Sequence, residues 1–284
     1  MSSSTALKIV MIGGTRGIGL EMCHHLANSG HDVALCGRSS NAEEIAQGLS
    51  TQYKITALGR VLDAVDASSC ANFASEAYKS LGGIDVLFAN AAIFGPVGKL
   101  ENIDVSRWAE TITTNTLALI NPVRAFLPYL RQSRSARSLT MSGGGLGGPR
   151  PIQRASAYFA SKAATVSLVE VLAEELRHDQ ITINAIAPGF FSTDFMHEAA
   201  EVGEEIAGVE LHNDANRQAD DSEVETLHQL NALVDFLISS KASLVTGRTL
   251  SARWDTPDRI TSSHESSNLF RLRRVDNDLI RETP

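Results

Sequence analysis

Short apolar segments alternate with amphipathic helical patterns along most of the chain, and this alternation constrains the fold more than any other feature. Most of the apolar segments are apolar throughout, which is typical of parallel strands that are buried on both faces. The segments between them are long enough for crossover helices, so the sequence predicts an α/β fold with a doubly wound parallel sheet. The predicted strands are Lys8–Ile12, Asp32–Cys36, Ile55–Leu62, Ile84–Ala89, Ser138–Ser142, Thr182–Ala187 and a late one near Val245–Ser251.

One domain over residues 6–255 accounts for this pattern. The length of 284 residues would also allow two domains, but α/β folds often run past about 250 residues as a single unit. The last segment, residues 256–284, is rich in Ser and Thr and holds only a small apolar cluster at Leu269, Phe270 and Leu272. We predict that this segment is a C-terminal extension and not a second domain.

The charge balance excludes several classes of partner. The chain has 33 acidic and 25 basic residues, a formal net charge of −8. Because nucleic acids and anionic membranes require clustered Lys and Arg, we expect neither as a partner. Its three cysteines show no paired spacing and no histidines at ligand intervals, which predicts neither a disulfide framework nor a metal site. With no signal-peptide pattern and no long apolar stretch, the sequence is that expected of a cytoplasmic protein.

A glycine-rich turn, Gly13-Gly14-Thr15-Arg16-Gly17-Ile18-Gly19, follows the first predicted strand. Glycines allow the backbone to turn tightly and to approach a pyrophosphate, whose charge is met by the amides at a helix N-terminus. The alternative is an ordinary loop between a strand and a helix. The strand before this turn and the helical pattern after it favour dinucleotide binding, because that motif requires both.

Tyr158 and Lys162 are four residues apart in a helical pattern, so their side chains lie on one helix face. A phenol ordinarily has a pKa of about 10, and a nearby ammonium lowers it electrostatically. The pair could therefore act as an acid and base near neutral pH. The alternative is a surface tyrosine beside a solvated lysine.

Together with other segments, these two motifs resemble the short-chain dehydrogenase/reductases over about residues 6–250. The resemblance implies a Rossmann-type fold, a nicotinamide cofactor, a small-molecule substrate and assembly into a homodimer or homotetramer. The other segments that carry it are Asn90-Ala91-Ala92 after a strand, Asn115 in Thr114-Asn115-Thr116, and Pro188-Gly189 followed by Thr193.

The same resemblance implies roles for single residues. Tyr158 would be the general acid towards a carbonyl, and Lys162 would bind the nicotinamide ribose and lower the pKa of Tyr158. Asn115 would hold a water molecule for proton relay, and Ser142 would polarise the substrate oxygen. The residues implied in cofactor binding are Gly13, Thr15, Arg16, Gly17, Ile18 and Gly19 in the turn, Arg38, Asp63 at the adenine, Asn90, Ala91, Tyr158, Lys162, Pro188, Gly189, and Thr193 at the nicotinamide carboxamide.

Two departures from the family pattern affect the predicted site. The family often has two serines after the fifth strand with the second one catalytic, whereas this chain has Ser142 followed by Gly143. Either position could correspond to the catalytic serine, and we expect Ser142 to act. The family also commonly ends its last strand with a Gly-Gly turn, but here the sequence from Ser251 to Asp255 is Ser-Ala-Arg-Trp-Asp. This departure predicts an atypical C-terminal wall of the pocket.

Residues about 195–230 correspond to the substrate lid of the family. Between His197 and Thr226 this segment has ten acidic residues against a single arginine. The charge is explained either by a solvated amphipathic helix or mobile loop, or by a charge-selective gate.

The residue after the second strand indicates the cofactor. A site that prefers NAD(H) usually has an acidic residue there for the ribose 2′-hydroxyl, but this chain has Cys36-Gly37-Arg38, and Arg16 adds a second positive charge. The sequence therefore predicts an NADP(H)-dependent oxidoreductase that acts on a carbonyl or secondary alcohol. Two alternatives remain: a cofactor-binding protein without redox turnover, and a non-redox isomerase or dehydratase on the same fold.

Overall fold

The centre of the protein is a seven-stranded sheet in the order β3-β2-β1-β4-β5-β6-β7, with every neighbouring pair parallel. It is seen in a computed structural model that describes residues 6–143, 153–191, 201–216, 221–263 and 271. This arrangement confirms the predicted doubly wound α/β fold. The strands are β1 (Lys8–Ile12), β2 (Asp32–Gly37), β3 (Ala57–Val61), β4 (Val86–Ala89), β5 (Arg137–Met141), β6 (Thr182–Ala187) and β7 (Thr249–Ser251).

The last strand is shorter than the sequence suggested, and its neighbours explain why. Before β7 begins, the Thr246 hydroxyl accepts a hydrogen bond from the Ile183 amide, and the Asn184 side chain donates to the Val245 carbonyl. Side chains therefore replace part of the backbone ladder at residues 245–248. The prediction of a strand near Val245–Ser251 is correct in place and too long at its start.

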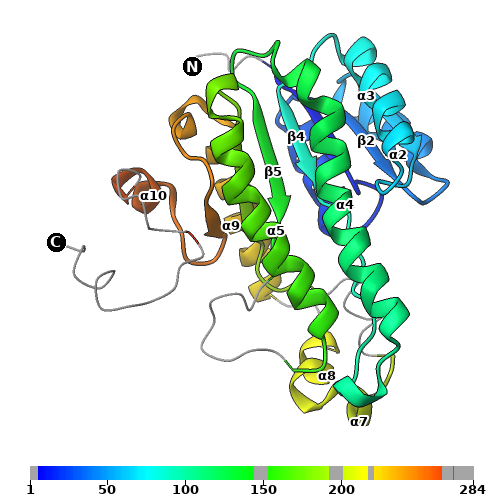
Figure 1. Cartoon of the computed structure of the whole chain (residues 1–284). Coiled ribbons are helices and arrows are strands. Elements are labelled where there is room, and N and C mark those ends of the chain that lie inside the picture. The colour runs from blue at the N-terminus through cyan, green and yellow to red at the C-terminus, as the bar shows by residue number, and fades with distance from the viewer. Residues whose placement is uncertain (1–5, 144–152, 192–200, 217–220, 264–270, 272–284) are drawn as a thin grey trace.

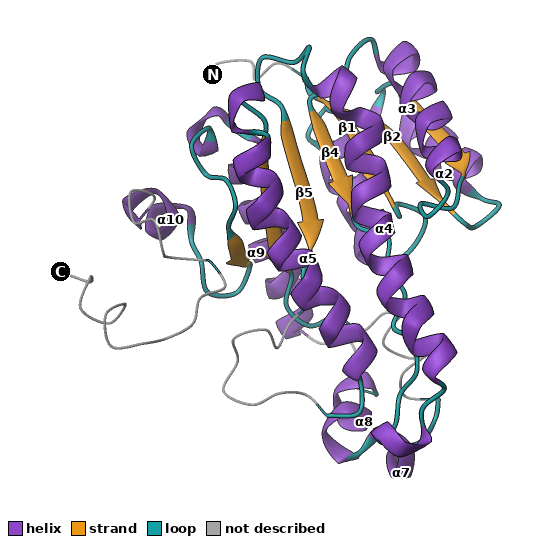
Figure 2. Cartoon of the chain, viewed as in Figure 1, coloured by secondary structure: helices purple, strands orange, loops and turns teal. Residues whose placement is uncertain are grey.

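Helices cover both faces of the sheet (Figures 1 and 2). One face packs against α1 (Gly17–Asn28), α2 (Ala42–Tyr53) and α9 (Asp221–Ile238), and the other against α3 (Ala67–Leu81), α4 (Val105–Leu130) and α5 (Ser156–Glu175). Each face contributes its own large apolar cluster, as expected for strands that are buried on both sides. The short helices are η1 (Leu100–Asn102), η2 (Arg177–Asp179), α7 (Glu204–Ala207), α8 (Val209–Ala215), η3 (Ser240–Ala242) and α10 (Pro257–Ser263).

The order of the strands reverses between β1 and β4, and ligands of doubly wound sheets bind at such a switch point. The turn after β1 and the segment after β4 meet there, beyond the carboxyl ends of the strands. The helices α7 and α8 lie past the same edge (Figure 1). The topology thus brings most of the predicted site residues to one place.

The start of the predicted C-terminal extension packs against the domain. Ile260 of α10 is only 1% exposed and belongs to the apolar cluster that also contains residues of α1 and α9. No helix within the described ranges is long and apolar enough to cross a membrane.

Candidate active site

A cavity of about 890 Å³ opens at the carboxyl edge of the sheet. Most of the predicted site residues line it, although their positions in the sequence span the chain from the first strand to the sixth. Gly19 and Asn115 contact residues of this group from outside the lining, and Thr193 falls outside the described residues. The predicted residues in the lining are Gly13, Thr15, Arg16, Gly17, Ile18, Arg38, Asp63, Asn90, Ala91, Ser142, Tyr158, Lys162, Pro188 and Gly189.

The glycine turn packs directly against the segment after β4. Gly13 has a φ of +83°, and a Cβ there would lie 2.8 Å from the Ala91 nitrogen. A Cβ at Gly19 would lie 2.7 Å from Asn90 Nδ2, which donates a hydrogen bond to the Gly13 carbonyl at 3.0 Å. Neither position has space for a side chain, so the turn requires glycine to approach β4.

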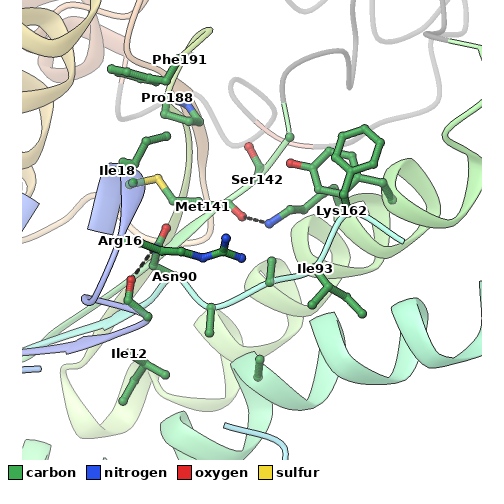
Figure 3. A pocket seen from close by; sticks show the side chains of 18 of the residues that line it. Ile12, Arg16, Ile18, Asn90, Ile93, Met141, Ser142, Lys162, Pro188 and Phe191 are labelled. Carbon is green, nitrogen blue, oxygen red and sulfur yellow. Dashed lines mark hydrogen bonds between the residues drawn. The ribbon is translucent and has the colours of Figure 1, made fainter. Parts of the chain in front are cut away.

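The start of α1 fits the pyrophosphate of a dinucleotide. The helix begins at Gly17, and Arg16 at the N-cap makes no side-chain capping bond to its first amides. Gly17 and Ile18 both line the cavity, and the Arg16 side chain extends into it (Figure 3). Uncapped amides and a cation beside an open cavity suit a bound phosphate group.

The far end of the cavity, at β2 and β3, is lined by Arg38 and Asp63. Both side chains are exposed, and the Asp63 carboxylate accepts the Val65 amide at 3.1 Å. The residues that directly follow β2 in the lining are Arg38 and Ser39, and neither carries a carboxylate. This end therefore offers a cation where an acidic residue would select a free ribose hydroxyl.

Lys162 is held at the end of strand β5. It is 6% exposed, and its Nζ donates a hydrogen bond to the Met141 carbonyl at 2.8 Å (Figure 3). Its Nζ also lies 5.6 Å from the centroid of the Tyr158 ring. Burial lowers the pKa of Lys162 to about 8, because the charged ammonium loses hydration.

The expected lowering of the Tyr158 pKa is not what the structure gives. Burial raises the pKa of Tyr158 above its ordinary value of 10. The physical reason is that the buried phenol loses solvent, which disfavours the charged phenolate. In this arrangement Tyr158 stays neutral and can donate a proton.

Asn115 joins the segment after β4 to helix α5. Its Oδ1 accepts the Ile93 amide, and its Nδ2 donates to the Ile93 carbonyl and to Ser161 Oγ. Ser161 Oγ in turn donates to the Tyr158 carbonyl at 2.7 Å. Because both hydrogens of Nδ2 are used within the protein, the Asn115 side chain positions the backbone around Tyr158.

Ser142 and Gly143 follow β5 and both line the cavity. A Cβ at position 143 would lie 3.1 Å from Lys162 Cγ and 3.4 Å from Tyr158 Cε1, so Gly143 faces this pair. Ser142 is 2% exposed, and its hydroxyl has no hydrogen-bond partner among the described residues. In Figure 3 this hydroxyl points away from the Lys162 ammonium.

The sequence analysis missed the aromatic surroundings of Tyr158. Phe94 stacks on the Tyr158 ring with centroids 4.8 Å apart and an interplanar angle of 11°, and Phe159 packs edge-on at 5.3 Å. Ala207 of α7 and Leu211 of α8 complete this small apolar cluster. The only sequence signal was the position of Phe94 four residues after Asn90, since the contacts themselves come from distant segments.

In the described part of the acidic segment, two apolar side chains of α7 and α8 point inward, while Ile206 and Val209 are exposed. Ala207 and Leu211 are buried, whereas Glu204, Glu205 and Glu210 are exposed. These two short helices therefore form an amphipathic cover over the Tyr158 side of the cavity.

Comparisons with known proteins agree with this geometry. The model of the short chain dehydrogenase family matches residues 8–203. The chain belongs to this family. It is therefore an oxidoreductase that transfers hydride between a nicotinamide cofactor and a carbonyl or alcohol group.

Individual relatives cover nearly the whole domain. The chain is 26% identical over 245 residues to the 3-oxoacyl-[acyl-carrier-protein] reductase FabG of Staphylococcus aureus, with 85% of this chain and 94% of that protein covered. The solved Pseudomonas aeruginosa RhlG/NADP active-site complex is 25% identical, with a TM-score of 0.71 and coverage of 87% and 95%. NAD⁺-bound xylitol dehydrogenase shares the fold at 21% identity, with a TM-score of 0.72 and coverage of 86% and 96%.

The lowered pKa of Lys162 predicts a dependence of stability on pH. In the unfolded chain this lysine keeps its proton up to about its ordinary pKa of 10.5, but in the folded chain it loses the proton near 8. Raising the pH from 8 towards 10.5 therefore favours the folded state, by up to about 3 kcal/mol. Urea unfolding of the wild type and of Lys162→Met at pH 7.5 and 10 measures this, because the variant lacks the titrating group. If the difference in unfolding free energy between the wild type and Lys162→Met is the same at both pH values, the lowered pKa of Lys162 is wrong.

Proposed function

We propose that the protein is an NADP(H)-dependent oxidoreductase in which Tyr158 and Lys162 carry the proton chemistry. The observation that supports this most is the meeting of the Tyr158 and Lys162 pair with an uncapped helix N-terminus in one cavity. A phosphate-binding turn and a proton donor are needed together only where a bound dinucleotide reacts. When bound, NADP(H) supplies or accepts the hydride.

The residues of the chain have separate tasks in this proposal. Tyr158 donates its phenolic proton to the carbonyl oxygen during reduction and takes a proton back during oxidation. Lys162 binds the ribose of the cofactor and presents a positive charge beside the reacting groups. Asn115 and Phe94 hold Tyr158 in place through its backbone and its ring. The apolar cover from α7 and α8 excludes water from this side of the cavity.

Removal of the phenolic hydroxyl tests the mechanism. Tyr158→Phe is expected to lower kcat by about 10² or more, because the general acid is lost, and to leave cofactor affinity nearly intact. Lys162→Ala is expected to lower both kcat and the affinity for the cofactor. Steady-state kinetics with a panel of ketones and alcohols, together with cofactor titrations, measures these effects. Tyr78→Phe is the matched control, since its hydroxyl bonds to Gln132 outside the cavity. More than a tenth of the wild-type turnover in Tyr158→Phe would refute the mechanism.

The preference for NADP(H) is supported by the end of the cavity at β2. Arg38 and Arg16 both line the cavity, and either can bond to a 2′-phosphate. RhlG was solved with NADP and the xylitol dehydrogenase with NAD⁺, so the shared fold is compatible with both cofactors. In this proposal the preference for NADP(H) over NAD(H) therefore depends on the positive charge of Arg38.

Loss of Arg38 tests this preference. Hydrogen bonds to charged groups contribute about 1.5–3 kcal/mol, so Arg38→Gln is expected to reduce the preference for NADPH over NADH by roughly ten- to a hundredfold. The measurement is the Kd of each cofactor for the wild type and the variant. Equal Kd values of the two cofactors for the wild type would sink the assignment.

We further propose that Ser142 polarises the substrate oxygen. A buried hydroxyl without a partner is costly, which supports a role towards a ligand, and a serine hydroxyl can rotate towards one. Ser142→Ala is then expected to lower kcat by about 10² to 10³. Gly143→Ser is the informative companion, because a side chain there would face Tyr158 after a small shift of Lys162. An effect of Ser142→Ala below about tenfold, with a gain of turnover in Gly143→Ser, would transfer the role to position 143.

The resemblance to the family also supports a cytoplasmic homodimer or homotetramer acting on a small molecule, and we include this assembly in the proposal. Gly143 keeps the alternative of a binding protein without redox turnover in view, since it faces Tyr158 without a side chain. Hydride transfer to any ketone of the panel decides against that alternative.

A further inference from the structure

The turn after β7 gives the cavity a feature that the family pattern lacks. Ser251, Arg253 and Trp254 all belong to the lining of the cavity that holds Tyr158 and Lys162. The guanidinium carbon of Arg253 lies 4.7 Å from the centroid of the Trp254 ring, within the range of a cation–π contact. Trp254 is 64% exposed although it is a large aromatic residue. A cation and an aromatic face are thus presented together at the rim.

Within the described part of the chain, the charge of Arg253 has no opposite charge bound to it. Among the described residues its guanidinium makes neither an ion pair nor a hydrogen bond. The nearby carboxylate of Asp255 instead accepts the Ser251 amide at 2.7 Å. Arg259 donates to the Trp254 carbonyl at 3.3 Å and lies 3.9 Å from Asp255. These bonds fix the turn while the cation of Arg253 faces the cavity.

Arg253 lies far from the end of the cavity where the cofactor phosphates would bind. The order of strands separates β7 from β2 by five strand intervals, which is about 24 Å at the usual spacing. Arg38 follows β2, and the glycine turn follows β1. The cation at β7 therefore lies at the opposite end of the cavity from Arg38, where it is available to a ligand other than the cofactor phosphates.

The rest of the lining restricts what could reach Arg253. Four phenylalanines line the same cavity, namely Phe94, Phe159, Phe190 and Phe191. Glu110 of α4 and Asp214 of α8 also line the cavity and repel a negative group in their neighbourhood. An anionic group on a flat, apolar molecule is thereby favoured at the β7 end and disfavoured at the helical end.

We propose that Arg253 and Trp254 form a subsite for a carboxylate carried on a planar, apolar carbonyl compound. A guanidinium can hold a carboxylate with two parallel hydrogen bonds, and an indole can stack on a planar group. That the ligand is a substrate depends on the proposed function, whereas the subsite itself depends only on the cavity and these two side chains.

Two pairs of probe ketones test the proposal through turnover. One pair is 4-acetylbenzoate and its methyl ester, which differ in charge and little in shape. A second acid and ester pair, built on biphenyl, places the carboxylate farther from the ketone. The wild type is expected to prefer each acid over its ester in kcat/KM. In Arg253→Gln this acid-to-ester ratio is expected to fall about fivefold to tenfold, as for a solvent-accessible charged hydrogen bond. Arg253→Lys keeps the charge without the planar guanidinium, and its acid-to-ester ratio is expected to lie between those of the wild type and Arg253→Gln.

A binding measurement gives a readout that needs no catalysis. The chain has two tryptophans, so Trp108→Phe leaves Trp254 as the single tryptophan, whose emission is selected over that of the four tyrosines by excitation at the red edge of its absorption. Terephthalate is expected to change its emission with a saturable dependence, and this response is expected to be lost when Arg253→Gln is added. Arg107→Gln, which removes an exposed arginine of α4 outside the lining, is the matched control and is expected to leave the response and the acid-to-ester ratio unchanged.

The two measurements separate this proposal from the proposed function. A fluorescence response that depends on Arg253, without turnover of any ketone, supports the subsite and contradicts the redox function. Turnover with the same acid-to-ester ratio in the wild type and Arg253→Gln for both probe lengths, and no response to terephthalate, overturns the subsite and leaves the redox function standing.

Discussion

The hydrogen bond from Lys162 to the Met141 carbonyl is the contact on which the rest of the site depends. A buried ammonium is tolerated only when it is hydrogen-bonded, and the end of strand β5 provides the acceptor. This bond fixes α5 against β5, and Tyr158 lies one turn earlier on the same helix. A Cβ at position 143 would already press on the Lys162 chain at 3.1 Å. The absence of a side chain at Gly143 therefore leaves room for the Lys162 side chain.

A second set of contacts holds Tyr158 from the other side. The chain of hydrogen bonds from Ile93 through Asn115 and Ser161 ends on the Tyr158 carbonyl, so the segment after β4, α4 and α5 are linked at one point. Stacking by Phe94 then orients the ring itself. The phenol is consequently placed by three segments, namely the one after β4, α4 and α5. This is how a parallel sheet with helical crossovers converts packing into a positioned proton donor.

Much of the fold could be predicted because its signals are local. Lys8–Ile12 and Thr182–Ala187 were predicted with the bounds that the structure has, since buried parallel strands are short apolar runs. The glycine turn and the spacing of Tyr158 and Lys162 could be recognised for the same reason. The start of β7 could not, because the side chains of Thr246 and Asn184 replace ladder bonds there. Ile260 shows a similar limit, since nothing local in a polar segment indicates that it is buried.

Contacts between distant segments set the chemistry that the sequence could not predict. The direction of the Tyr158 pKa shift follows from the burial of the phenol, which depends on contacts that α5 makes with distant segments. The place of Phe94, Leu211 and Arg253 in one cavity likewise depends on three parts of the chain.

Net charge is a poor guide to this cavity. Although the chain is acidic overall, the described lining contains Arg16, Arg38 and Arg253 against Asp63, Glu110 and Asp214, and buried Lys162 in addition. With charges so nearly balanced, long-range attraction contributes little to selecting an anionic ligand. Selection must therefore come from single groups at short range, and their separation along the sheet determines which end of a ligand each one can reach.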